Sequence, residues 1–168
     1  MAKRSRLLRV VIAFALAWPM VAVAGTPAAA APVTAFFAYH TRDCALSYAR
    51  GTIDWNPTIG DPAPRVDVVG ALVDDLSLCG QRPQGEPFAR FTAYVDGARV
   101  DEERVALERT GDIIRPVRLF GFSLTAPAWT ELIDQVDVQV CRTAGPMLPA
   151  FTCGDAQTYR RPRIGPAV

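Results

Sequence analysis

The sequence predicts an all-β protein, an antiparallel β-sandwich of immunoglobulin-like or jelly-roll-like topology with about seven strands. Three observations support this prediction. Apolar residues recur at every second position in most segments, turn-forming residues separate these segments at fairly regular spacing, and an Asp-Gly pair stands between two of them. Helical and strand-like segments do not alternate, which disfavours a doubly wound parallel sheet.

The first two predicted strands cover residues 44–55 and 65–75. Gly51 interrupts the first and suggests a bulge or bend there. The second is apolar on both faces in its middle, as expected of a well-buried strand. Residues 56–64 and 80–87 are rich in Pro, Gly and polar residues, which predicts loops after both strands.

The clearest local signal is a hairpin. Residues 88–95 are aromatic-rich, and the pair Asp96-Gly97 separates them from a second strand over 98–107. The second strand carries a charged run at 101–104, which suggests a strand at the edge of a sheet. A helix over 100–109 remains an alternative, because that segment contains good helix formers.

Three more strands are expected towards the C-terminus, at 113–124, 134–141 and 156–160. The second of them has the cleanest alternation of apolar and polar residues in the chain. Between them, residues 126–133 fit one short helical turn, with Pro127 at a permitted early position.

The N-terminal segment has the pattern of a cleavable secretory signal peptide over residues 1–24. Four cations and no acid occupy the first nine residues, and an apolar run follows from residue 10 to residue 23. The run ends in Ala22-Val23-Ala24, which fits a small-residue cleavage site. A membrane anchor needs about 20 apolar residues, and this run is shorter and contains Pro19. We therefore expect an exported chain with no stable membrane span.

The exported part, about 144 residues, is long enough for one domain with a real core. We expect a flexible lead-in at 25–40, a single sandwich domain at 41–160 and a flexible tail at 161–168. The leader holds four of the 18 basic residues and none of the 17 acidic ones, so cleavage changes the net charge from +1 to −3. Nucleic-acid binders usually carry a basic face, so no nucleic-acid partner is expected.

Four cysteines in an exported chain predict two disulfides, for which three connectivities are possible. We favour Cys44–Cys79 and Cys141–Cys153. The second pair would close a short loop that contains Gly145, Pro146 and Pro149, and the first would tie the first strand to the loop after the second. A zinc site is the weaker alternative, because no C-x-x-C pair is present and the only histidine, His40, is distant in sequence from the later cysteines.

Four segments together resemble small secreted proteins of actinobacteria. They are SYARGTIDW, RVDVVGALVDD with a cysteine after it, FTAYVDGARVD, and VDVQVCRT with a later Cys-Gly pair. The resemblance covers most of residues 44–154 and rests on strand patterns and cysteines, not on catalytic signatures. It implies an exported β-sandwich of unassigned function and supplies no activity and no site residues.

The sequence is poorly equipped for hydrolase chemistry. Ser123 lies in a motif that resembles a nucleophile elbow, but the final glycine is missing and the segment is strand-like. His40, the only base of its kind, is expected to be a solvated residue ahead of the first strand. The cysteines are expected to be paired, so no thiolate nucleophile is available. We therefore predict no catalytic, cofactor-binding or metal residues.

Three weaker possibilities involve binding. Trp55, Trp129 and Tyr94 could stack on a sugar ring, although packing within the fold is the simpler interpretation. Asp74 and Asp75, with Asp43 nearby, could bind calcium or form a solvated turn. The arginines at 160, 161 and 163 could contact an anionic polymer, although a frayed terminus is the simpler expectation.

These observations favour a secreted, non-enzymatic β-sandwich, extracellular or associated with the cell wall, that binds an unknown extracellular protein or glycan. One alternative is a protease inhibitor that presents a disulfide-held loop at 143–152, or the loop at 56–64. Another is a small secreted hydrolase. A binding module should expose an apolar or aromatic patch, which separates it from the other two.

Overall fold

The computed structural model describes residues 32–55, 64–81, 83–108, 113–127, 132–144 and 150–163, in which nine strands and no helix occur. The predicted signal peptide and most of the loop at 56–64 lie outside the described residues. Because this part of the chain has no helix, it has none that could span a membrane. The strands are β1 Val33–Arg42, β2 Ala45–Asp54, β3 Arg65–Asp75, β4 Pro87–Val95, β5 Ala98–Ala106, β6 Val117–Thr125, β7 Gln135–Thr143, β8 Phe151–Cys153 and β9 Gln157–Arg160.

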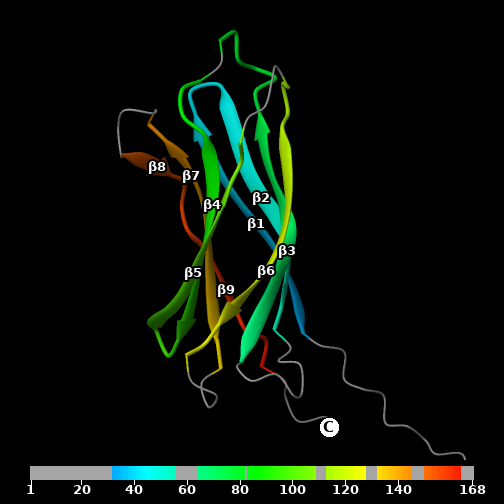
Figure 1. Ribbon diagram of the computed structural model, residues 1–168, viewed down its shortest axis with the longest axis vertical. Coiled ribbons are helices and arrows are strands. Elements are labelled where there is room, and N and C mark those ends of the chain that lie inside the picture. Colours follow the sequence, from blue (N-terminus) through cyan, green and yellow to red (C-terminus); the bar gives the residue numbers. More distant parts are fainter. Residues whose placement is uncertain are drawn as a thin grey trace, which may run out of the picture.

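The strands form two antiparallel sheets, which confirms the predicted sandwich. The four-stranded sheet has the order β1-β2-β3-β6. The five-stranded sheet has the order β5-β4-β7-β8, and β9 also pairs with β7. Figure 1 shows the long strands of both sheets running roughly along the long axis of the molecule.

Two of the nine strands were not expected from the sequence. β1 occupies the second half of the segment 25–40 that was expected to be a flexible lead-in, and that expectation is wrong from Val33 onward. It pairs with β2 over its full length and buries Phe36, Ala38 and His40 on its inner face. β8 is only three residues long, too short to show a period of two. Its pairing places Cys153 opposite Cys141.

The hairpin of β4 and β5 is confirmed. Asp96 and Gly97 have φ angles of 49° and 80°, and two consecutive residues with positive φ are what a two-residue type I′ turn requires. β5 lies at the edge of its sheet, as its charged run predicted, and the helical alternative at 100–109 is wrong. The strand expected at 113–124 begins only at Val117.

The core lies between the two sheets and is centred on aromatic rings. Phe91 of β4 meets Phe36 of β1 edge-on at 5.6 Å between centroids, and Phe120 and Phe122 of β6 at 5.4 and 5.0 Å. Gly51 makes room for this cluster, because a Cβ there would lie 2.8 Å from the Phe36 ring. The register of β2 is continuous at this point, so the predicted bulge is absent and a close approach takes its place.

Both predicted disulfides are present. Cys44–Cys79 ties the β1–β2 turn to the segment after β3, and Cys141–Cys153 links directly opposed positions of β7 and β8.

The first residue of the tail expected at 161–168, Arg161, is hydrogen-bonded to the sandwich. The backbone N–H of Arg161 donates to the carbonyl oxygen of Asp134 over 2.9 Å, and its guanidinium donates to the carbonyl oxygen of Trp55.

Candidate functional site

The outer face of the four-stranded sheet carries the largest group of exposed apolar side chains in the described residues. We call this group the apolar face. Its members alternate along their strands with residues that point into the core. Six members are exposed, two are half-buried and one is buried. The exposed ones are Phe37, Tyr39, Leu46, Val69, Val117 and Leu119, the half-buried ones are Tyr48 and Ala71, and the buried one is Val73.

The strand registers align these side chains in rows across the sheet. One row runs from Tyr39 through Tyr48 and Val73 to Val117. The neighbouring row runs from Phe37 through Arg50 and Ala71 to Leu119. The apolar face therefore crosses all four strands, with Arg50 as the one charged position in these rows and Val73 as a buried one.

Most side chains of the apolar face are open to solvent, and its aromatic rings contact one another. Leu119, Val69 and Phe37 are 79%, 59% and 51% exposed. The ring of Phe37 lies 6.0 Å from that of Tyr39 and 5.9 Å from that of Tyr48, measured between centroids. These contacts hold the aromatic part in place before any ligand binds, which reduces the entropy lost on binding.

A single charge lies within these two rows. The guanidinium of Arg50 stands 6.0 Å from the centroid of the Tyr48 ring, within the range of a cation–π interaction. No carboxylate among the described residues forms an ion pair with it. At one end of the face Arg115 pairs with Asp75. Hydrogen bonds from Arg115 first, and then from the side chain and the backbone of Ser77, lower the pKa of that carboxyl to about 2.

A second polar group is buried between the sheets near the β1–β2 turn. The Ser47 hydroxyl donates to Asp74 Oδ1 over 2.8 Å, and one guanidinium nitrogen of Arg142 donates to both Ser47 and Asp74. All three residues are fully buried. A further nitrogen of Arg142 donates to the carbonyl oxygen of Gly85 over 3.1 Å. This arrangement ties β7 to β2 and β3 and leaves the Ser47 hydroxyl inaccessible.

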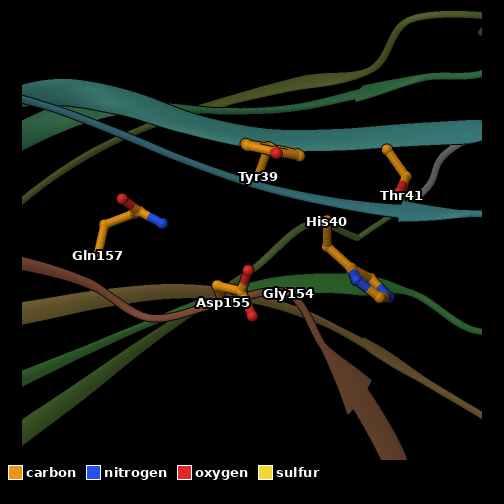
Figure 2. Close-up of a pocket in the computed structure, with 6 residues that line it drawn as sticks. All are labelled: Tyr39, His40, Thr41, Gly154, Asp155 and Gln157. Carbon is orange, nitrogen blue, oxygen red and sulfur yellow. The ribbon is translucent and has the colours of Figure 1, made fainter.

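His40 adjoins that group and borders a crevice of about 210 Å³ between β1 and the segment after β8. Its Nε2 lies 3.2 Å from the Thr152 hydroxyl. Burial first, and then the charges of Arg142 and Arg42, lower the pKa of the imidazole. Figure 2 shows the ring turned away from Asp155, which lines the same crevice. His40 is therefore a buried residue of β1 and not the solvated residue that the sequence suggested.

Another crevice, of about 320 Å³, lies at one end of the outer face of the five-stranded sheet. Phe88 and Phe151 meet there edge-on at 5.6 Å, and the guanidinium of Arg104 stands 5.9 Å from the Phe88 ring. Glu86 and Thr143 add polar atoms to its lining. It is narrower than the apolar face, and its one cation is already paired with Glu102.

The candidate hydrolase residues are not brought together. His40 lies on β1 and Ser123 on β6, at opposite edges of the four-stranded sheet. The Ser123 hydroxyl donates to Asp67 over 2.5 Å. The residue opposite His40 is Ser47, whose hydroxyl is held by Asp74 and Arg142. That contact could not be read from the sequence, because Ser47 and Arg142 are 95 positions apart.

Two of the residues considered for sugar and calcium binding, Trp55 and Asp74, are bonded within the interior of the fold. Trp55 is fully buried and donates its indole N–H to the Thr34 hydroxyl over 2.8 Å. Tyr94 is half-buried, and Trp129 lies outside the described residues. Asp74 is paired with Arg142 in the interior, so the alternative of a solvated turn is wrong at that residue. Of the two segments proposed for a reactive loop, nearly all of 56–64 and half of 143–152 lie outside the described residues.

Sequence reasoning missed the apolar face for a specific reason. Phe37 and Tyr39 belong to the segment that was interpreted as a lead-in. The signal available was the alternation of Tyr48 and Leu46 with buried residues in β2. No protein-family model, curated protein or solved structure matches the chain.

Proposed function

We propose that this chain is a secreted, non-enzymatic β-sandwich that binds another extracellular protein through the apolar face. The observation that supports this proposal is the set of aromatic and aliphatic side chains across four strands, most of them exposed, with one cation among them. Large exposed apolar patches on otherwise soluble domains typically mark interaction surfaces. Aromatic residues and arginine are the types most enriched at the centres of protein interfaces.

The composition of the apolar face favours a protein over a glycan. A sugar ring stacks on a flat aromatic side chain and needs hydrogen-bonding groups beside it. Here the rings pack on one another at about 30° tilts, and the other half of the face is aliphatic, with Val69, Val117 and Leu119. Aliphatic side chains contribute by burial against other apolar surface, which a protein partner provides. The Arg50 guanidinium would donate hydrogen bonds to a carboxylate of that partner.

Export rests on the leader pattern and on the cysteines. Two disulfides and no free cysteine among the described residues are consistent with an oxidising compartment outside the cytoplasm. The resemblance to secreted actinobacterial β-sandwich proteins agrees with this location. The buried state of Ser47 supports a non-enzymatic role, because its hydroxyl is held by Asp74 and Arg142 and is not placed to meet a substrate.

The test is affinity capture with a variant of the apolar face. The exported chain is immobilised and exposed to culture medium and to a cell-wall extract of the producing organism. The double change Phe37→Ser and Val69→Ser should weaken retention of the captured protein roughly tenfold or more, as expected for interface anchors. Phe151→Ser, on the other sheet, is the matched control and should retain it. Equal retention by both variants, or no specific retention by the original chain, contradicts the proposal.

A further inference from the structure

We propose that two copies of this chain pair antiparallel through the edge strand β6, centred on Gly121, so that the two four-stranded sheets become one sheet of eight strands. This proposal does not depend on the ligand of the apolar face. It rests on the open backbone of β6, on the protection of the opposite edge, and on the match of β6 with itself.

The backbone of β6 is open on one side. On the side that faces β3, the even-numbered residues of β6 form the backbone hydrogen bonds. Two bonds that extend the ladder beyond its ends show this parity. The Asp74 N–H donates to the Pro116 carbonyl (3.1 Å), and the Ala126 N–H donates to the Pro64 carbonyl (3.0 Å). Residues of opposite parity must therefore point their N–H and C=O groups away from β3. At Thr125 the outward N–H donates to Asp101. From residue 117 to residue 123, no partner for the outward groups occurs among the described residues.

The opposite edge of the same sheet is protected. The Tyr159 hydroxyl accepts from the Phe37 N–H over 2.8 Å and donates to the Phe37 carbonyl over 2.9 Å. Gly154 lies so close to the Tyr39 carbonyl that a Cβ there would be 2.1 Å from its oxygen. Along β6, in contrast, no proline, lysine or bulge discourages pairing. The difference between the two edges indicates that β6 is left free for a partner strand.

The sequence of β6 complements itself. A two-fold axis at Gly121 pairs this residue with its copy and places Leu119 opposite Ser123 of the second copy. Phe120 then lies opposite Phe122 of the second copy, on the core side. Both rings stack within one chain at 5.8 Å and are only partly buried, so a second copy would cover them.

Charge does not oppose this pairing. The only charged residue of β6 is Arg118, which would lie opposite Leu124 of the second copy. Six positions would separate the two Arg118 side chains along the strands, roughly 20 Å at the rise of an antiparallel strand. The guanidinium of Arg118 already donates to the Ala106 carbonyl over 2.6 Å. The pairing therefore uses mainly residues 119–123.

The dimer would join two apolar faces. Directly paired residues of an antiparallel ladder point to the same side of the sheet. Leu119 and Ser123 both belong to the outer face, so the outer faces of the two copies would be continuous. A partner with two matching sites would then bind with increased avidity.

The first experiment measures molar mass by light scattering and sedimentation at high micromolar concentration of the exported chain. We expect twice the mass of one chain. Gly121→Pro should give the mass of one chain, because it removes the central outward N–H without removing a bond to β3. Gly121→Ala is the matched control and should remain dimeric, since the nearest atom to its Cβ is Val69 Cγ2 at 3.8 Å. Val69→Lys should also remain dimeric, which separates edge pairing from contact between apolar faces.

Hydrogen exchange gives a second readout on the unmodified chain. The amides of Leu119, Gly121 and Ser123 should become protected as concentration rises, while that of Asp96 should not change. If Gly121→Pro lacks the circular dichroism spectrum of the folded protein, Leu119→Lys takes its place as the edge variant. The mass of one chain at every concentration overturns the proposal. A dimer that survives the edge variant, or that only Val69→Lys dissociates, overturns it equally.

Discussion

At the scale of the residue, the least predictable feature is the buried ion pair of Arg142 and Asp74. Both side chains are fully buried, and the Ser47 hydroxyl completes the group. Two charges in the interior require excellent geometry, because each loses its hydration on folding. Here Asp74 Oδ1 accepts from Ser47 and Arg142, and Arg142 also donates to a backbone carbonyl. The pair is stabilising only while all of its members are present.

Removing one member should therefore be far more destabilising than removing both charges. We expect Arg142→Met to lower the free energy of unfolding by about 3–5 kcal/mol, because Asp74 is left buried without its counter-charge. The double variant Arg142→Met with Asp74→Leu should recover most of that loss. Urea unfolding at neutral pH measures both. A single variant that costs no more than the double variant would show that the pair is not coupled.

The sequence allowed the disulfides but not this ion pair to be predicted. Four cysteines offer few pairings, and the turn residues between Cys141 and Cys153 favour one of them. Asp74 continues the inward register of Val66, Val68 and Leu72, which the pattern of β3 does contain. A charged residue at the end of a strand usually faces solvent, however, and its partner lies 68 positions away. Contacts of this kind depend on how the sheets stack.

At the scale of the element, the difference between β1 and β6 decides which surfaces are available. The strands that were predicted have regular alternation or an explicit turn, as in the β4–β5 hairpin. β1 was missed because its inward residues are a phenylalanine, an alanine and a histidine, which do not read as an apolar stripe. Its outer edge is closed by Tyr159 of β9, a contact across 122 positions. The contact that closes this edge therefore could not be predicted from local pattern alone.

The Tyr159 hydroxyl should be what closes the β1 edge. Tyr159→Phe keeps the ring near Phe36 but removes the acceptor of the Phe37 N–H and the donor to its carbonyl. We expect a loss of about 1–2 kcal/mol in the free energy of unfolding and faster hydrogen exchange at the Phe37 amide. Exchange measured by NMR, with the Ala49 amide as an internal reference, tests this. Unchanged protection at Phe37 would mean that packing alone closes the edge.

At the scale of the whole molecule, the edges of the two sheets lie next to each other along two sides of the sandwich. We call these sides seams; contacts between the sheets close one of them and leave the other open. On the closed side, β1 meets β8 and β9 through Tyr159, Gly154 and the contact between His40 and Thr152. On the open side, β5 and β6 are joined at their ends, where Arg118 reaches Ala106 and Asp101 reaches Thr125. The apolar face spans the sheet between these two seams. The architecture thus rigidifies one side and leaves the other available for association.

The closed seam should make the stability of the whole molecule depend on pH near neutrality. His40 is the only histidine in the chain, and burial together with Arg142 and Arg42 lowers its pKa from the ordinary value of about 6.5. Between the lowered pKa and the ordinary one, the unfolded chain binds a proton that the folded protein does not. The contribution of the neutral His40 to the free energy of unfolding is therefore fully present above about pH 6.5. It falls as the pH is lowered through the window between the two pKa values.

Urea midpoints measured at about pH 7.5 and about pH 5.5 test this dependence, with His40→Gln as the matched variant. The unmodified chain should lose stability on acidification with a slope of at most about 1.4 kcal/mol per pH unit, the limit for one proton. His40→Gln should show a smaller change, because glutamine can still contact Thr152 but does not titrate. Acidic side chains titrate at lower pH and affect both proteins alike. Parallel loss in the two proteins would assign the dependence to groups other than His40, and a gain on acidification would reverse the inferred direction of its pKa.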